Sequence, residues 1–221
     1  MESGDYPGTL AELEARFSSE EACREYLCQL RWPDGFRCPR CGAVKTWPLH
    51  SGRWQCVGCG HQVSATAGTV FQDTRTPLTV WFRAMWLMTS QKNGISALGL
   101  QQVLGWGSYQ TAWTCLHKLR RTMIRPGRER LPRVHQVISL VKRWLLGTHQ
   151  GAVRAEHLQD YLDEFTFRFN RRRSRSQGKL FYRLVQQSAA LEPTTYKEIV
   201  ASAHLPASAG YNPLGIPKSD G

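Results

Sequence analysis

The sequence predicts a mainly helical protein that carries one small β module held by a metal ion. Four cysteines form two closely spaced pairs, and the segments around them are short and bounded by turns. Apolar residues recur at helical spacing before this module and through most of the chain after it. At 221 residues the chain has room for one ordinary domain and a small module.

The cysteine spacing identifies the β module as a zinc ribbon. Fourteen residues separate two C-x2-C pairs, and a glycine follows each pair on a tight turn. Four soft thiolates at this spacing select zinc over magnesium or calcium, and they close the tetrahedral coordination sphere. We therefore expect a structural zinc ion whose ligands are Cys38, Cys41, Cys56 and Cys59.

A disulfide framework and an iron site are the alternatives to zinc. A disulfide framework suits a short secreted chain, whereas this chain has seven cysteines, an odd number, and no apolar leader at its N-terminus. The spacing therefore favours zinc. The other cysteines, Cys23, Cys28 and Cys115, are expected to be buried thiols, and His61 is expected to be a bystander.

The net charge of +12 is concentrated after residue 31. The first 31 residues carry seven acidic and three basic side chains, which leaves 26 basic and ten acidic side chains for the rest. This excess predicts a polyanionic partner, and beside a zinc ribbon nucleic acid is the first candidate. Because no run of about 18 apolar residues suggests a membrane span, we expect a cytoplasmic protein without a membrane partner.

Two short helices are predicted before the ribbon, within an N-terminal region at 1–33. Apolar residues follow a helical period on both sides of Ser18-Ser19, which can cap a second helix. The ribbon is expected at 34–71. Its small antiparallel sheet is predicted from three short segments, 45–49, 53–55 and 62–65.

Three helices are predicted in a block at 75–125. The first is strongly apolar, with Thr76 as its cap and Pro77 at its first helical position. Ser96 caps a short second helix, and the third spans 109–123.

The second and third of these helices, joined by a tight glycine turn, fit a helix-turn-helix. On the third helix, polar side chains gather on the side opposite the apolar ones, and a basic run follows. The alternative is a solvated helix face in an all-α bundle, but the basic run favours contact with DNA phosphates. The expected DNA-binding residues are Gln110, Thr114, His117, Lys118 and Arg121.

Three more amphipathic helices are predicted after the block, over 134–146, 155–170 and 176–190. Gly147 is expected to end the first of them. After Glu192, four prolines among small polar residues predict a loosely ordered tail within 191–221.

Several strings resemble the IS1595 family of insertion-sequence transposases. They are the ribbon, the helical block with Ser96-Ala97 and Thr111-Ala112-Trp113, the string from Lys142 to Gly151, and the string from His157 to Arg172. The resemblance covers about residues 10–190. It implies that a helix-turn-helix DNA-binding block is followed, at 132–190, by the last helices of a ribonuclease-H-like catalytic domain.

Members of this family hold two magnesium ions with two aspartates and a third residue that stands seven positions before a lysine. The resemblance places His135 in the third position and Lys142 in the lysine position. In the family, the segment that corresponds to the one ending at Leu131 is followed by the strands that carry both aspartates. In this chain no such strands come next, and Leu131 is followed directly by Pro132 and, three residues later, by His135. The resemblance therefore implies an internal deletion, and magnesium is expected for intact members but not for this chain.

The remaining acidic residues do not replace the missing aspartates. Two-metal strand transfer needs carboxylates from separate elements to hold ions about 3.5 to 4 Å apart. Asp160 and Asp163 share one predicted helix, and Asp73 lies alone at the exit of the ribbon. The sequence thus predicts a catalytically incompetent protein.

The expected function is binding to the terminal inverted repeats of a transposon, with self-association or association with an intact transposase. Two alternatives stay open. One is an active DDE-type transposase that recruits Asp73, Asp160 or Asp163. The other is a zinc-ribbon module for protein interaction or transcription.

Overall fold

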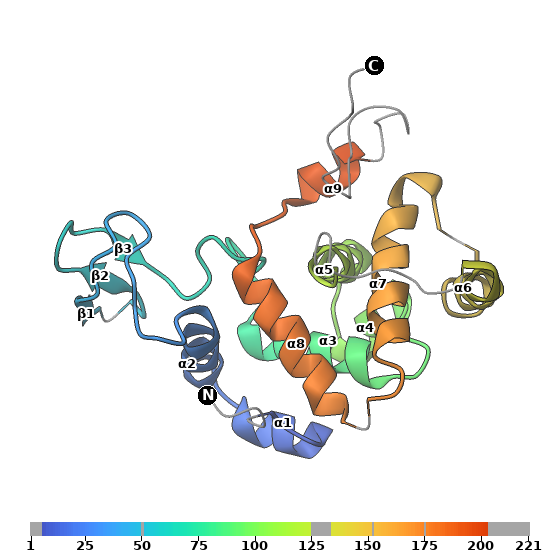
Figure 1. Ribbon diagram of the computed structural model, residues 1–221, viewed down its shortest axis with the longest axis horizontal. Coiled ribbons are helices and arrows are strands. Elements are labelled where there is room, and N and C mark those ends of the chain that lie inside the picture. The colour runs from blue at the N-terminus through green and yellow to red at the C-terminus, as the bar shows by residue number, and fades with distance from the viewer. Residues whose placement is uncertain (1–5, 50, 125–133, 152, 175, 203–221) are drawn as a thin grey trace.

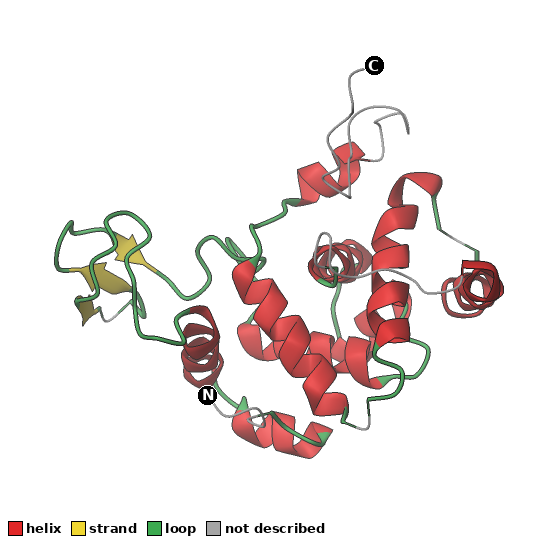
Figure 2. Ribbon diagram, in the orientation of Figure 1, coloured by secondary structure: helices red, strands yellow, loops and turns green. Residues whose placement is uncertain are grey.

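The computed structural model describes residues 6–49, 51–124, 134–151, 153–174 and 176–202 (Figure 1). As the sequence predicts, the protein is mainly helical with one small antiparallel sheet (Figure 2). The junction at 131–132 and most of the tail at 191–221 lie outside the described residues. In chain order the elements are α1 (Leu10–Arg16), α2 (Glu20–Arg31), β1 (Thr46–Pro48), β2 (Trp54–Cys56), β3 (Gln62–Val63), α3 (Leu78–Ser90), α4 (Ala97–Leu104), α5 (Tyr109–Thr122), α6 (Val134–His149), a 3-10 turn (Ala155–His157), α7 (Leu158–Asn170), α8 (Gln177–Ala190) and α9 (Tyr196–Ser202).

The three strands form a sheet in the order β1-β2-β3, with both pairs antiparallel. Gln55 of β2 lies opposite Trp47 on one side and Gln62 on the other. Figure 1 shows the sheet at one end of the molecule, beyond α2 and away from the remaining helices. The ribbon is therefore a protruding module on a helical body.

Local capping signals set the starts of several helices. Ser19 accepts a hydrogen bond from the backbone N–H of Ala22, and Ser96 accepts one from Gly99, as the sequence predicts. Gly105 ends α4 in the left-handed conformation, with φ of 67°, which glycine adopts without steric cost.

The start of α3 differs from its prediction. Pro77 is the N-cap residue, so Thr76 lies one position outside the helix and makes no capping bond. The Glu20 carboxylate accepts hydrogen bonds from Leu78 N at 3.0 Å and Thr79 N at 2.9 Å. A carboxylate at a helix N-terminus also interacts favourably with the helix dipole, so the first turn of α2 caps α3.

The end of α6 also differs from its prediction. The helix continues through Gly147 to His149, and the left-handed residues that follow it are Gln150 and Gly151. Glycine inside a helix costs about 1 kcal/mol relative to alanine but does not stop it.

One hydrophobic core joins helices from both ends of the chain. Helix α8 packs against α2 and α3. The Phe181 ring on α8 lies 5.7 Å from Phe82 and 6.0 Å from Phe17, measured between ring centroids. Helix α8, near the C-terminal end of the described chain, thus packs on helices from the first half of the sequence.

Helix α6 lies at the edge of the molecule, beyond α7 (Figure 1). Trp144 fixes it there, because the indole Nε1 donates to the Asn93 carbonyl at 2.8 Å and the ring lies 5.7 Å from Phe165. Several apolar side chains of α6 stay exposed, namely Ile138, Leu140 and Leu146. None of the described helices combines the length and the apolar character that crossing a bilayer would require.

Candidate metal centre and nucleic-acid interface

Two tight turns of the ribbon bring its cysteines together. One turn, before β1, carries Cys38 and Cys41, while Cys56 ends β2 and Cys59 lies in the turn after it. The N–H of Gly42 donates to the Cys38 carbonyl at 2.8 Å, and Gly60 closes the second turn in the same way. Both glycines have positive φ, 75° and 69°, so a side chain at either position would strain the turn.

The four thiols fit a zinc ion. All four Sγ atoms lie within 4.8 Å of one another, and two pairs, Cys38–Cys59 and Cys41–Cys56, are separated by 3.7 and 3.5 Å. A tetrahedral site with Zn–S bonds of 2.3 Å has S···S separations of about 3.8 Å. The sequence-predicted ligand set therefore has the geometry of a closed, structural zinc site.

The other cysteines have no role in this site. Burial raises the pKa of Cys23 to about 12 and that of Cys28 to about 11. Burial also raises the pKa of Cys115, which lies in the core. All three thiols therefore stay protonated and unreactive at neutral pH.

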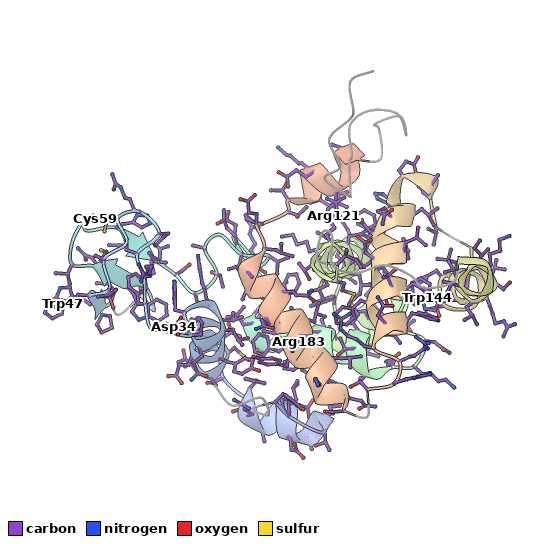
Figure 3. The ribbon with its side chains drawn as sticks, in the orientation of Figure 1. Asp34, Trp47, Cys59, Arg121, Trp144 and Arg183 are labelled. Carbon is purple, nitrogen blue, oxygen red and sulfur yellow. The ribbon has the colours of Figure 1, made fainter. Side chains whose placement is uncertain are left out.

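Some of the predicted DNA-binding side chains of α5 are exposed to solvent, and others are buried against the rest of the protein. Gln110 is exposed, and the hydroxyl of Thr114 donates to its backbone carbonyl. Lys118 is half-buried, and burial lowers its pKa. His117 is fully buried, and Arg121 donates to the Asp160 carboxylate, so these two residues face α7 (Figure 3 labels Arg121).

A buried polar network explains this orientation. His117 Nδ1 lies 2.6 Å from the Asp160 carboxylate, and one turn later Arg120 donates to Glu164 at 2.8 Å. Burial lowers the pKa of His117 to about 4, so its imidazole is neutral at pH 7. Burial alone would raise the pKa of Asp160, but the bond with His117 and the charge of Arg121 lower it below its usual range.

The expectation that His117 and Arg121 lie on a DNA-facing surface therefore does not match their positions. Sequence reasoning missed the partners of this face because they are distant in the chain: Asp160 stands 43 positions after His117, and Glu164 stands 44 positions after Arg120. One signal could have identified them. Asp160 and Glu164 are four residues apart, so they lie on one face of α7, where acidic side chains can meet the basic face of a neighbouring helix.

A second group of metal-ligating side chains lies in this network. Ligand atoms of His117, His157 and Asp160 come within 4.8 Å of one another. The Asp160 carboxylate is already engaged by His117 and Arg121, and the rings of Trp113, His117 and His157 pack together. These contacts join α5 to α7.

The remaining predicted site residues are not brought together. The backbone of His135 lies in α6, its side chain falls outside the described part of the chain, and Lys142 is exposed on the same helix. Asp73 is exposed in the loop before α3, whereas Asp160 and Asp163 are buried on α7. Among the described residues there are two groups of metal-ligating side chains, the four cysteines of the ribbon and the group of His117, His157 and Asp160, and neither contains two carboxylates.

Comparisons with known proteins agree with the strings noted in the sequence. The model of a transposase zinc-ribbon domain of the IS1595 type matches residues 18–62, and that of an ISXO2-like transposase domain matches residues 108–170. The second match begins just before α5 and includes α6 and α7. It therefore starts inside the block at 75–125 that the sequence assigns to a helix-turn-helix.

The chain is also similar to an uncharacterised protein in the transposable element ISH50 of Halobacterium salinarum. The two are 27% identical over 114 residues, which is 50% of this chain and 38% of the relative. The aligned part of the chain thus spans well under half the length of that relative. No solved structure matches the chain.

Proposed function

Because the chain belongs to the IS1595 transposase family, we propose that it binds the terminal DNA of an insertion sequence without cutting it. The observation that carries this proposal is the four-thiolate cluster, which lies within a segment that matches a transposase zinc ribbon. A closed zinc site holds a small rigid surface and supplies no catalytic water.

The ribbon offers a basic surface for DNA. Arg40, Lys45 and Arg53 are exposed on it: Arg40 lies in the first cysteine turn, Lys45 just before β1, and Arg53 just before β2. Phosphate contacts of this kind fix the position of a protein on DNA and make binding sensitive to salt. On α5, the exposed Gln110 together with Thr114 and Lys118 remains in the proposed contact set, whereas the buried His117 and the ion-paired Arg121 do not.

The absence of strand transfer is the second part of the proposal. The carboxylates of α7 are engaged within the protein: Asp160 by His117 and Arg121, Glu164 by Arg120, and Asp163 by Gln159. Carboxylates used in this way, all on one helix, are poorly suited to enclosing a pair of magnesium ions. An internal deletion of the catalytic sheet, near residue 131, would account for this arrangement.

A protein of this kind competes with an intact transposase for the same DNA ends, alone or as a mixed assembly. Magnesium belongs to the intact enzyme in this scheme. In this chain the ion that we propose is a structural zinc, held by Cys38, Cys41, Cys56 and Cys59.

The test of DNA binding uses fluorescence anisotropy with the zinc-loaded chain. Duplexes that carry the inverted repeats flanking the reading frame are compared with scrambled duplexes of the same length. We expect tighter binding to the repeats, with an affinity that falls steeply as salt rises. Equal affinity for both duplexes would reject specific end binding.

A pair of matched variants locates the contact. Lys45→Ala with Arg53→Ala removes two charges from the ribbon, and Arg154→Ala with Lys197→Ala removes two exposed charges elsewhere. If both ribbon side chains contact phosphates, the first pair lowers the slope of log K against log salt by about 1.8, and the control pair leaves it unchanged.

A nicking assay tests the absence of catalysis. Supercoiled plasmid that carries both ends is incubated with the protein and magnesium or manganese, and no nicked product is expected. Nicking that disappears in His135→Ala would instead establish the chain as an active DDE-type transposase.

Exposed apolar side chains on the ribbon favour a second candidate, a protein-binding module. Val44, Trp47 and Val57 are exposed by 64%, 65% and 49%. Such side chains are enriched at protein interfaces when they lie together. Under this alternative, Trp47→Ala would abolish binding to a protein partner while leaving DNA affinity unchanged.

A further inference from the structure

A groove opens on the side of the helical body opposite the ribbon. It is bounded by the end of α3, the inner side of α6 and the end of α7, and it has a volume of about 960 Å³. Figure 3 shows Trp144, one of its lining residues, between α6 and α7. The groove is separate from the zinc site and from the exposed edge of α5.

The groove carries a strong positive charge. Its described lining includes no acidic side chain, and its basic side chains are Lys92, Arg143, Arg168, Arg171 and Arg172. Arg168 donates to backbone carbonyls at the end of α3, so its guanidinium is already used. Lys92 and Arg143 are exposed, and no described carboxylate forms a salt bridge with either of them. A lining of this kind attracts a polyanion.

Aromatic rings line the same groove. Phe165 and Phe169 are stacked, with centroids 5.7 Å apart and planes inclined by 19°. The Arg172 guanidinium lies 3.9 Å from the centroid of Phe169, and Arg172 is exposed. The stack therefore runs from buried Phe165, through half-buried Phe169, to a planar cation at the surface. Trp144 stands next to it, 5.7 Å from Phe165.

We propose that this groove binds a single-stranded segment of DNA, with phosphates on Lys92 and Arg143 and an unpaired base stacked on Arg172. Proteins that bind single strands combine a basic groove with planar groups on which bases stack, and guanidinium planes serve this purpose as well as aromatic rings. A duplex keeps its bases stacked inside and cannot use such a platform. The inference rests on the proposed DNA-binding function, and it assigns unpaired DNA to a site distinct from the ribbon.

The charge contribution is tested with the full zinc-loaded chain and two labelled oligonucleotides of the same sequence, one single-stranded and one duplex. Lys92→Glu with Arg143→Glu reverses two charges in the groove. The control, Arg154→Glu with Lys197→Glu, reverses one arginine and one lysine that are also exposed, so both variants change the net charge equally. We expect the groove variant to lose at least tenfold in affinity for the single strand and the control to lose less than threefold. Equal losses in the two variants would overturn the site.

The stacking contribution is tested with Arg172→Lys, which keeps the charge and removes the planar guanidinium. A loss of about threefold to tenfold on the single strand, with no change on the duplex, is expected from the usual strength of base stacking. An equal loss on both oligonucleotides, in this variant or in the groove charge variant, would overturn the assignment to unpaired bases. Circular dichroism melts of each variant check that the fold is intact, which is expected because the altered side chains are exposed.

The two proposals fail in distinguishable ways. If the inverted repeats bind no better than scrambled duplex while the groove variant still loses single-strand affinity, specific end binding fails and the groove stands. If the ribbon variant loses duplex affinity but the groove variant binds the single strand normally, the groove fails and the ribbon stands.

Discussion

Breaking the Arg120–Glu164 pair should destabilise the protein strongly. The side chains are 1% and 0% exposed, and Arg120 Nε donates to the Glu164 carboxylate at 2.8 Å. The Arg120 guanidinium also lies 3.9 Å from the centroid of Tyr161. Arg120→Met removes the cation and leaves a carboxylate buried without its partner, so we expect a loss of about 3 to 5 kcal/mol in the free energy of unfolding.

Removing both charges should have a much smaller effect. Arg120 Nη2 and Glu164 Oε1 have no hydrogen-bond partner among the described residues, so the pair is incompletely satisfied. Apolar replacement of a buried pair is often neutral or stabilising, and Arg120→Met with Glu164→Leu should therefore recover most of the loss.

Urea denaturation followed by circular dichroism measures both variants. In a chain of this size, the single variant should also lower Tm by roughly 6 to 20 °C. A loss below about 1 kcal/mol in Arg120→Met, or a double variant as unstable as the sum of the two single variants, would refute the reasoning. Either result would mean that the charges stay hydrated and that α5 and α7 separate in solution.

Three further predictions concern the metal, a helix cap and pH. Cys41→Ser, or treatment with a strong chelator, should unfold the ribbon and leave the helical body folded. Limited proteolysis should then cut within 34–71 while far-UV circular dichroism keeps its helical signal, and loss of the helical signal as well would contradict a separate module. Glu20→Ala should cost about 1 kcal/mol because two N–H groups at the start of α3 lose their acceptor, and the urea midpoint should shift accordingly. Burial lowers the pKa of His149 from 6.5 to about 3, so the unfolded chain binds the extra proton and stability should fall as pH drops below about 6.5. His149→Gln should make this dependence of the urea midpoint less steep between pH 6.5 and 4, with the remainder due to His117, whose pKa burial also lowers, and an unchanged slope would exclude a contribution from His149.

The parts of the structure that the sequence predicts depend on neighbours in the chain. The zinc ligands follow from two turns of four residues, and the caps Ser19 and Ser96 act on N–H groups three positions away. Helical periodicity likewise locates α5 and α7. Each of these features is fixed within one or two turns of backbone.

The features that the sequence did not predict depend on distant partners. The cap of α3 comes from Glu20, 58 positions before Leu78. Periodicity shows that His117 and Arg121 share a polar face of α5, but it cannot show that an equally polar face of α7 covers them. A buried polar pair and a solvated face have the same pattern when each helix is considered alone.

The position of α8 has a consequence for how the protein is made. The ribosome must release Gln177–Ala190 before the grooves of α2 and α3 can be filled, because Phe181, Leu184 and Val185 complete a core that the first hundred residues begin. Until then, the nascent chain exposes apolar surface around Phe82, which chaperones bind and which promotes aggregation. A premature stop codon before the end of α8 would therefore leave the helical core incomplete and its apolar surface permanently exposed.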